Sequence, residues 1–179
     1  MRSAAALTLC VEATEEAKAY LRIHGTDEDA LTARLIRSAA ELAERFTGRT
    51  LVAREFTEVL RASAAWQRLA ASPVRAILGV ETWPVEGTAA ALPAEAYTVD
   101  IDAAGEGWVR LTAPVDAPRV RVRFEAGLAM GWAELPEPLP QGAVWLAAHL
   151  YTHRDDAGGA GPPAAVRALW RPYRKLRIA

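Results

Sequence analysis

A change in the spacing of apolar residues divides this chain into segments and most constrains its fold. Between Arg49 and Glu125 apolar residues recur at every second position in several runs, and proline and glycine interrupt the pattern often. On either side of this stretch the apolar residues recur three or four positions apart. A period of two is typical of strands, and a period near 3.6 is typical of helices. The sequence therefore predicts an α+β fold, a helical bundle with a small antiparallel sheet.

The clearest strand is predicted at residues 120–125, where Val120, Val122 and Phe124 alternate with charged side chains. Such a strand has one face toward a core and one toward solvent. Four further strands are expected at residues 51–60, 74–83, 97–101 and 108–112.

Two helices are predicted before the sheet and two after it, and the last of these, at residues 164–178, forms a C-terminal helical arm. Thr14, followed by Glu15 and Glu16, is typical of a helix start, because a hydroxyl caps the end that carboxylates also favour. A stronger start at residues 26–29 opens a second helix, which Gly48 ends. The third helix is expected at residues 139–153.

The composition is that of an ordinary globular protein, with 179 residues that are 51 % hydrophobic and 24 % charged. The longest run without a charged residue, 138–153, is shorter than the roughly 20 apolar residues of a membrane span, so no membrane partner is expected. The apolar start runs directly into acidic residues, which argues against an export signal. Cys10 is the only cysteine, so no disulfide forms within the chain. We expect synthesis in the bacterial cytoplasm.

Candidate catalytic and metal sites are few. His149 and His153 stand four apart on a predicted helix, a spacing that lets two imidazoles share a metal, with Asp155 or Asp156 as a third ligand. Capping of the helix end is the favoured alternative. Asp100 and Asp102 share one strand face, where they either bind a cation or keep an exposed edge solvated. The sequence shows no nucleophile paired with a base. It predicts no enzyme, no cofactor and no metal.

The charges are distributed unevenly along the chain. The net charge is -1, but residues 1–156 hold 16 basic and 22 acidic groups, and no acidic residue follows Asp156. We interpret residues 1–156 as a core domain, 157–163 as a Gly/Pro hinge and 164–179 as a basic, aromatic C-terminal arm. Three roles for the arm stay open: packing on its own domain, docking on a partner protein, or contact with nucleic acid.

Four segments, in their order and spacing, resemble the head-tail connector (adaptor) proteins of long-tailed phages and gene transfer agents. The first covers residues 15–49 and ends in Glu44-Arg45-Phe46-Thr47-Gly48-Arg49. The second is Ser72-Pro73-Val74-Arg75-Ala76-Ile77. The third runs from Arg121-Val122-Arg123-Phe124-Glu125-Ala126-Gly127 to the helix at 141–154, and the fourth is 166–174. The chain departs from the family pattern in an alanine-rich insert at 86–95 and in an arm richer in arginine.

The resemblance implies a structural role in the neck of a virion or phage-like particle. Such proteins form a dodecameric ring under the portal protein, extend the DNA channel and join the head to a stopper or tail-terminator protein. It implies that double-stranded DNA passes through without sequence-specific contact. The residues expected to bind the portal are Arg167, Leu169, Trp170, Arg171, Tyr173, Arg174, Lys175 and Arg177. The alternative function is nucleic-acid binding by the basic arm.

Overall fold

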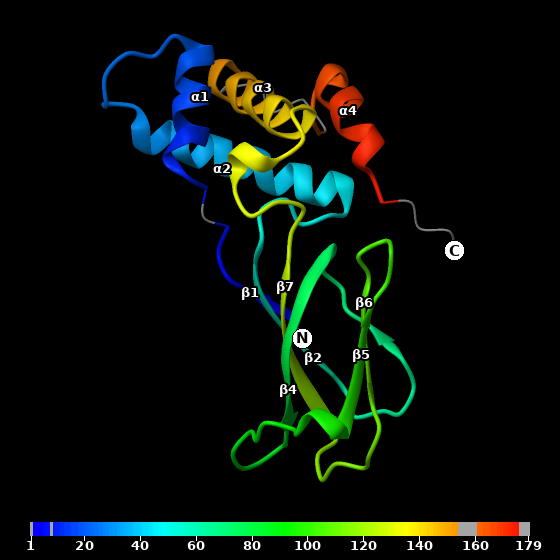
Figure 1. Cartoon of the computed structure of the whole chain (residues 1–179). Helices are drawn as coiled ribbons and strands as arrows, with labels where there is room; N and C mark the ends of the chain where they lie inside the picture. The colour runs from blue at the N-terminus through cyan, green and yellow to red at the C-terminus, as the bar shows by residue number, and fades with distance from the viewer. Residues whose placement is uncertain (1, 8, 154–160, 176–179) are drawn as a thin grey trace. The chain divides into compact units, whose positions relative to one another are not determined.

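The computed structural model describes residues 2–7, 9–153 and 161–175. The chain forms two compact units (Figure 1). The sheet unit consists of Met1–Ala6 and Ala53–Leu128, and the helical unit of Leu7–Val52 and Ala129–Ala179. Each unit has its own buried core. The described part of the predicted arm, 164–175, belongs to the helical unit, and most of the predicted hinge lies outside the described residues.

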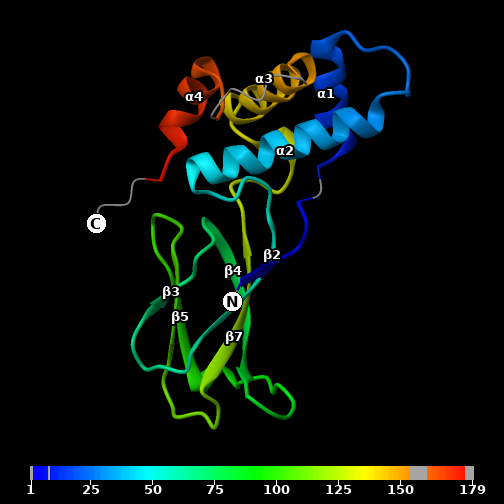
Figure 2. The same cartoon turned by 180° about the vertical axis from the view of Figure 1, so that it is seen from behind.

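The sheet unit holds two antiparallel sheets, visible in Figures 1 and 2. The first has the order β1-β2-β7-β4 and the second the order β3-β6-β5. The strands are β1 Arg2–Ala4, β2 Arg54–Arg61, β3 Gln67–Arg68, β4 Val74–Trp83, β5 Tyr97–Ile101, β6 Gly107–Leu111 and β7 Arg119–Ala126, with a short 3-10 turn, η1 Ala94–Ala96, before β5.

The alternation in β7 separates core from solvent as the sequence predicts. Val120, Val122 and Phe124 are buried, and the ring of Phe124 stacks on that of Phe56 with 5.6 Å between centroids. On the opposite face Arg121 pairs with Glu81, a residue of β4. The central strand β7 therefore has one face in the core and one that carries paired charges.

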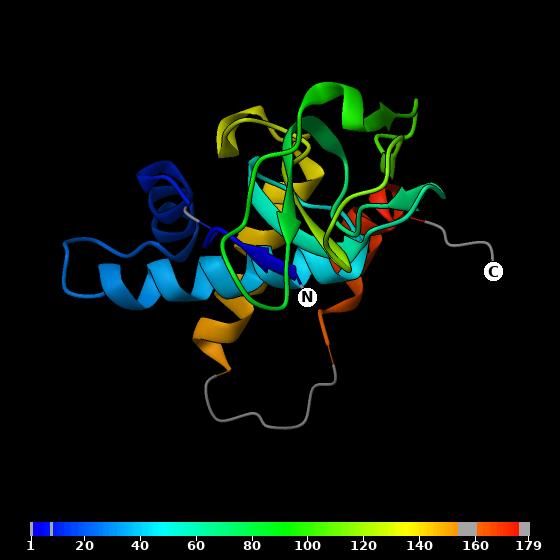
Figure 3. The same ribbon diagram turned by 90° about the horizontal axis from the view of Figure 1, so that it is seen from below.

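The helical unit is built around the longest helix. Its elements are α1 Val11–Leu21, α2 Asp29–Thr47, η2 Trp132–Glu134, α3 Pro138–Thr152, α4 Ala164–Trp170 and η3 Arg171–Tyr173. Helix α2 contacts α1, α3 and α4, and Figure 3 shows α1 and α3 beside it. The small buried residues Ala39, Ala40 and Ala43 on α2 allow close approach of its neighbours.

The predicted α+β fold is confirmed, with differences at the element ends. The strands at 74–83 and 97–101 match in both bounds. Helix α1 begins at Val11 rather than near Thr14, and Cys10 at its N-cap makes no side-chain capping bond. Strands β1 and β3, of three and two residues, were not predicted, because a period needs more residues than that. Within the described parts of the chain, no helix has the length and apolar character of a membrane span.

Candidate interaction surface at the C-terminal segment

Trp170 anchors the C-terminal segment in the helical unit. Its side chain is fully buried, and its indole N–H donates a 3.3 Å hydrogen bond to the carbonyl oxygen of Leu139 on α3. Its ring lies 5.9 Å from that of Phe46 on α2. Val166, one turn earlier on α4, is buried as well. Helix α4 therefore packs on its own unit through one apolar face.

Gly142 on α3 makes this packing possible. A Cβ atom at this position would lie 2.3 Å from the indole nitrogen of Trp170, a distance at which the two atoms overlap. Only glycine lets the indole ring approach the helix backbone so closely.

The residues after α4 are held against the end of α2. The Nε of Arg49 donates a 3.1 Å hydrogen bond to the carbonyl of Tyr173, and the backbone N–H of Lys175 donates a 2.7 Å bond to the carbonyl of Thr47. The guanidinium of Arg174 lies 5.8 Å from the ring centre of Phe46, within cation–π range. Residues 171–175 thus have a defined path over the helical unit.

Three arginines of this segment point outward. Arg167, Arg171 and Arg174 are exposed, and the first two are four residues apart, where the helix and the following 3-10 turn bring them to one side. Arg167 and Arg171 form no ion pair with any residue in the described ranges. The segment therefore offers guanidinium groups to a partner that carries carboxylates or phosphates.

The eight residues predicted to bind a portal protein divide by position. Trp170 is buried, Leu169, Tyr173 and Lys175 are half-buried, and Arg167, Arg171 and Arg174 are exposed. Arg177 lies outside the described residues. The structure exposes the three arginines along α4, η3 and the residue after η3, and the buried Trp170 at the end of α4 anchors this segment.

The other sequence candidates have structural surroundings. The rings of His149 and His153 lie 4.2 Å apart, and Nδ1 of His153 is 3.0 Å from the carbonyl oxygen of His149, so His153 can cap the end of α3. Asp155 and Asp156, the predicted further ligands, lie outside the described residues. The residues that are described contain no group of three or more potential metal ligands.

Asp102 organises a turn. Its Oδ1 accepts hydrogen bonds from the backbone N–H groups of Ala104 and Glu106, each at 2.9 Å. Its Oδ2 accepts a 3.2 Å bond from the indole N–H of Trp108. These contacts give Asp102 a local structural role, the turn chemistry that aspartate commonly supplies.

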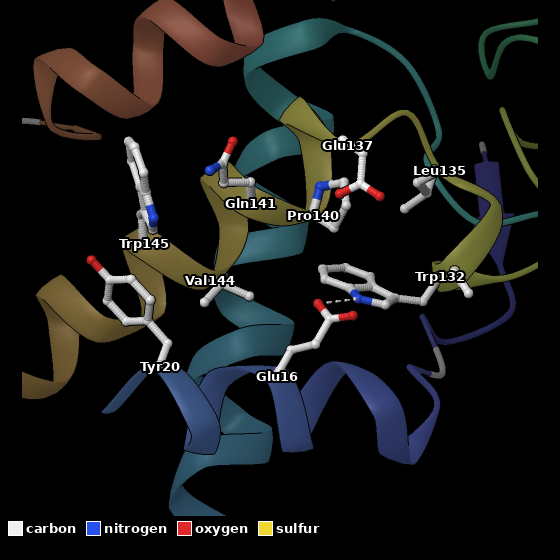
Figure 4. Close-up of a pocket in the computed structure, with 10 residues that line it drawn as sticks. Glu16, Tyr20, Trp132, Leu135, Glu137, Pro140, Gln141, Val144 and Trp145 are labelled. Carbon is white, nitrogen blue, oxygen red and sulfur yellow. Dashed lines mark hydrogen bonds between the residues drawn. The ribbon is translucent and has the colours of Figure 1, made fainter. Parts of the chain in front are cut away.

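A second surface feature of the helical unit was not found from the sequence. A groove between α1, η2 and α3 is lined by Tyr20, Trp132, Trp145 and two glutamates (Figure 4). Its residues come from segments more than 100 positions apart, so no local spacing reveals it. The only signal in the sequence was an unusual share of tryptophan, with six in the chain.

Comparison with known proteins gives sequence and structural relatives. Residues 13–83 match the model of the phage gp6-like head-tail connector proteins. Among curated proteins, no sequence matches the chain.

Three solved structures share the fold over nearly the whole chain. One, from the neck of an empty gene transfer agent (GTA) particle computed with C6 symmetry, has a TM-score of 0.82 at 24 % identity and covers 100 % of this chain and 97 % of that chain. A second, from the virion of a native GTA particle, has a TM-score of 0.80 at 26 % identity and the same two coverages. A third, from the neck of a native GTA particle computed with C12 symmetry, has a TM-score of 0.74 at 28 % identity and covers 99 % of this chain and 97 % of that chain. The resemblance found in the sequence is confirmed: residues 13–83 are similar to the phage gp6-like head-tail connector proteins, and the whole chain is similar in fold to chains of GTA particles.

Proposed function

We propose that the chain is a ring-forming head-tail connector subunit in the neck of a phage-like particle. The observation that carries this proposal is the likeness to chains of a GTA virion and of a GTA neck, which extends over nearly the full length of both chains. The C12 symmetry of one of these necks supports a ring of twelve copies. In this role the chain lies under a portal protein, extends the DNA channel and carries a stopper or tail-terminator protein on its other side. The work of such a subunit is structural rather than catalytic.

The portal contact is assigned to the exposed cations of the C-terminal segment. Arg167 and Arg171 form no ion pair within the described ranges, and Arg174 stacks on Phe46. Arginine is enriched where proteins bind each other. Leu169, Tyr173 and Lys175 border these arginines, and Arg177 extends the cationic sequence. Trp170 contributes by fixing the segment rather than by touching the portal, because its side chain has no exposed surface.

The test is a double charge reversal, Arg167→Glu with Arg171→Glu. Both side chains are exposed and make no described ion pair, so we expect the unfolding midpoint to change little. Capture of the chain by portal-bearing heads should fall at least ~10-fold, because like charges placed across an interface repel. The measurement is the amount of chain that sediments with heads.

The matched control is Arg61→Glu with Arg119→Glu in the sheet unit. These arginines face each other on β2 and β7, are exposed, and change the net charge by the same amount. Head capture should be retained. Equal loss in both double variants would contradict the assignment of the portal contact, and tight, salt-sensitive binding of the wild-type chain to duplex DNA would favour a nucleic-acid-binding function instead.

A further inference from the structure

The groove on the helical unit is an acidic and aromatic surface. It has a volume of about 940 Å³ and lies between α1, η2 and the start of α3. Figure 4 shows Trp145 and Tyr20 at one end and Trp132 at the other. Glu16 and Glu137 line it, and none of its ten lining residues is cationic. Below, this surface is called the acidic groove.

The groove has side chains that can bind cations, namely a carboxylate held in place and an exposed aromatic ring. Trp132 is buried, and its indole N–H donates a 3.0 Å hydrogen bond to Glu16, which holds that carboxylate over the groove. Tyr20 is 55 % exposed, so its ring face is open to a partner. Guanidinium groups bind carboxylates and stack on aromatic rings, and this groove offers both.

The complementary surface lies on α2 of the same unit. Arg34, Arg37 and Arg45 are exposed on the side of α2 opposite to its buried face, which contains Ile36 and Ala43. The three arginines span about 16 Å along the helix at 1.5 Å per residue. None of them forms an ion pair with a residue in the described ranges. Two acidic residues, Glu41 and Glu44, lie between them in the sequence, and the carboxylate of Glu44 accepts the N–H of Leu51. These three residues are called the arginine stripe.

The two surfaces face in different directions. The buried face of α2 packs on α1 and α3, and α2 contributes no residue to the acidic groove. In Figure 4 the ribbon of α2 passes behind the groove. The arginine stripe lies on the side of α2 opposite to its buried face. One subunit therefore cannot join its own stripe to its own groove. Copies can join head to tail, the arrangement that closes into rings.

We propose that the acidic groove of one copy binds the arginine stripe of α2 on the next copy. The proposal rests on the proposed function, because it names the partner of each subunit within the ring. Guanidinium groups of the stripe pair with Glu16 and Glu137 and stack on the exposed aromatic rings. A second copy is the occupant because the chain itself supplies the matching charge on the opposite side of the same unit.

The test mixes two variants, each of which should self-associate poorly on its own. The stripe variant is Arg34→Glu with Arg37→Glu. The groove variant is Glu137→Arg with Gln141→Arg, which leaves the hydrogen bond between Glu16 and Trp132 intact. In each variant the stripe and the groove carry the same sign, so the concentration needed for half-maximal self-association should rise at least ~10-fold.

An equal mixture of the two should associate again. The arginine stripe of the groove variant then meets an acidic groove, and the acidic stripe of the stripe variant meets a basic groove. A ring of twelve can alternate the two chains, and we expect recovery to within about threefold of the wild-type concentration. Sedimentation and native mass measurement, on the free chain and on heads, report the association, and circular dichroism checks that each variant is folded.

Three outcomes decide the proposal. Recovery in the mixture supports it, together with unchanged association of the control Arg61→Glu with Arg119→Glu. No recovery in the mixture of folded variants overturns it, as does a wild-type chain that stays monomeric both free and on heads. The Arg167→Glu, Arg171→Glu variant separates this proposal from the proposed function, because it should lose head capture and keep self-association.

Discussion

Trp170 illustrates how one buried residue positions an exposed charged surface. Arg167 and Arg171 are exposed because Trp170, which precedes Arg171, is anchored on α3, and neither arginine forms an ion pair with a residue that the structure describes. The anchor in turn depends on Gly142, whose missing side chain leaves room for the indole. A basic, aromatic sequence therefore contains two kinds of residue, those that hold the segment and those that are free to bind.

The variant Gly142→Ala should destabilise the helical unit by ~1–3 kcal/mol, the usual cost of overpacking a filled core. The added Cβ would lie 2.3 Å from the indole nitrogen of Trp170, so either α4 or α3 must move. Urea unfolding measures the loss. Gly131→Ala is the control, because a Cβ there meets nothing within 4 Å, and it should change the free energy of unfolding by less than ~0.5 kcal/mol. Equal effects of the two substitutions would mean that the indole does not pack as described.

Lys18 is a buried cation that joins α1 to the start of α2. Its Nζ lies 2.6 Å from Oδ1 of Asp29 and 3.3 Å from Oε1 of Glu15. The hydrogen bond to Asp29 is the largest influence and raises the pKa of Lys18 above its ordinary value of 10.5, although burial opposes the shift. A pKa raised on folding stabilises the fold below the unfolded-state pKa, and this contribution disappears as the pH rises through the folded-state pKa.

We therefore expect Lys18→Met to lower the unfolding midpoint at pH 8. The difference from the wild-type chain should shrink as the pH rises above 10.5, the ordinary pKa of lysine. Lys18 then loses its proton, first in the unfolded chain and at higher pH in the folded chain, so the stabilising ion pairs disappear. Thermal unfolding of both chains at pH 8 and at alkaline pH tests this. A difference that stays constant over this range would show that the ion pairs with Asp29 and Glu15 contribute nothing.

At the scale of elements, the end of α2 depends on both a glycine and the C-terminal segment. Gly48 takes a positive φ of 70°, and its N–H bonds the carbonyl of Glu44 at 2.9 Å. The carbonyl of Thr47 accepts the N–H of Lys175, and the carboxylate of Glu44 accepts the N–H of Leu51. The last turn of the helix is thereby supplied with donors that a free helix end lacks.

Replacing Gly48 by alanine should cost about 1–2 kcal/mol, the penalty of a left-handed conformation for a residue with a Cβ. The added atom would lie at an ordinary 3.5 Å from the Cβ of Lys175, so the cost comes from the backbone and not from a clash. Asparagine tolerates this conformation better, and Gly48→Asn should lose less. Urea denaturation ranks the three chains, and an alanine variant as stable as wild type would contradict this account.

Element positions were predictable where the pattern was long. The strand at 74–83 and the glycine that ends α2 follow from local spacing and backbone preference. The start of α1 was wrong by three residues, because Thr14 has the residue type of a cap but lies within the helix. Strand β1 is held by backbone pairing with β2, and pairing through the backbone alone produces no side-chain pattern that predicts a strand.

At the scale of the whole molecule, the net negative charge argues against tight binding to DNA. Residues 1–156 hold six more acidic than basic groups, and the full chain has a net charge of -1. We expect the free chain to bind duplex DNA no tighter than ~10⁻⁴ M at physiological salt, the weak end of non-specific binding. Fluorescence anisotropy at low and high salt measures the affinity for duplex DNA. The double variant Arg167→Glu, Arg171→Glu should remove any binding seen at low salt. Micromolar or tighter binding that survives high salt would contradict the proposed role as part of a DNA channel.

The sequence by itself determined the α+β class, the order of the longer elements, the uneven charge and the resemblance to connector proteins, because each depends on residue type and short-range spacing. Only the tertiary structure decided that Trp170 faces inward while its neighbouring arginines face outward. It also decided that Glu16 and Trp132, 116 positions apart, are bonded in one groove. Contacts of this kind join residues whose separation in the chain carries no periodic signal, so they appear only once the helices have packed.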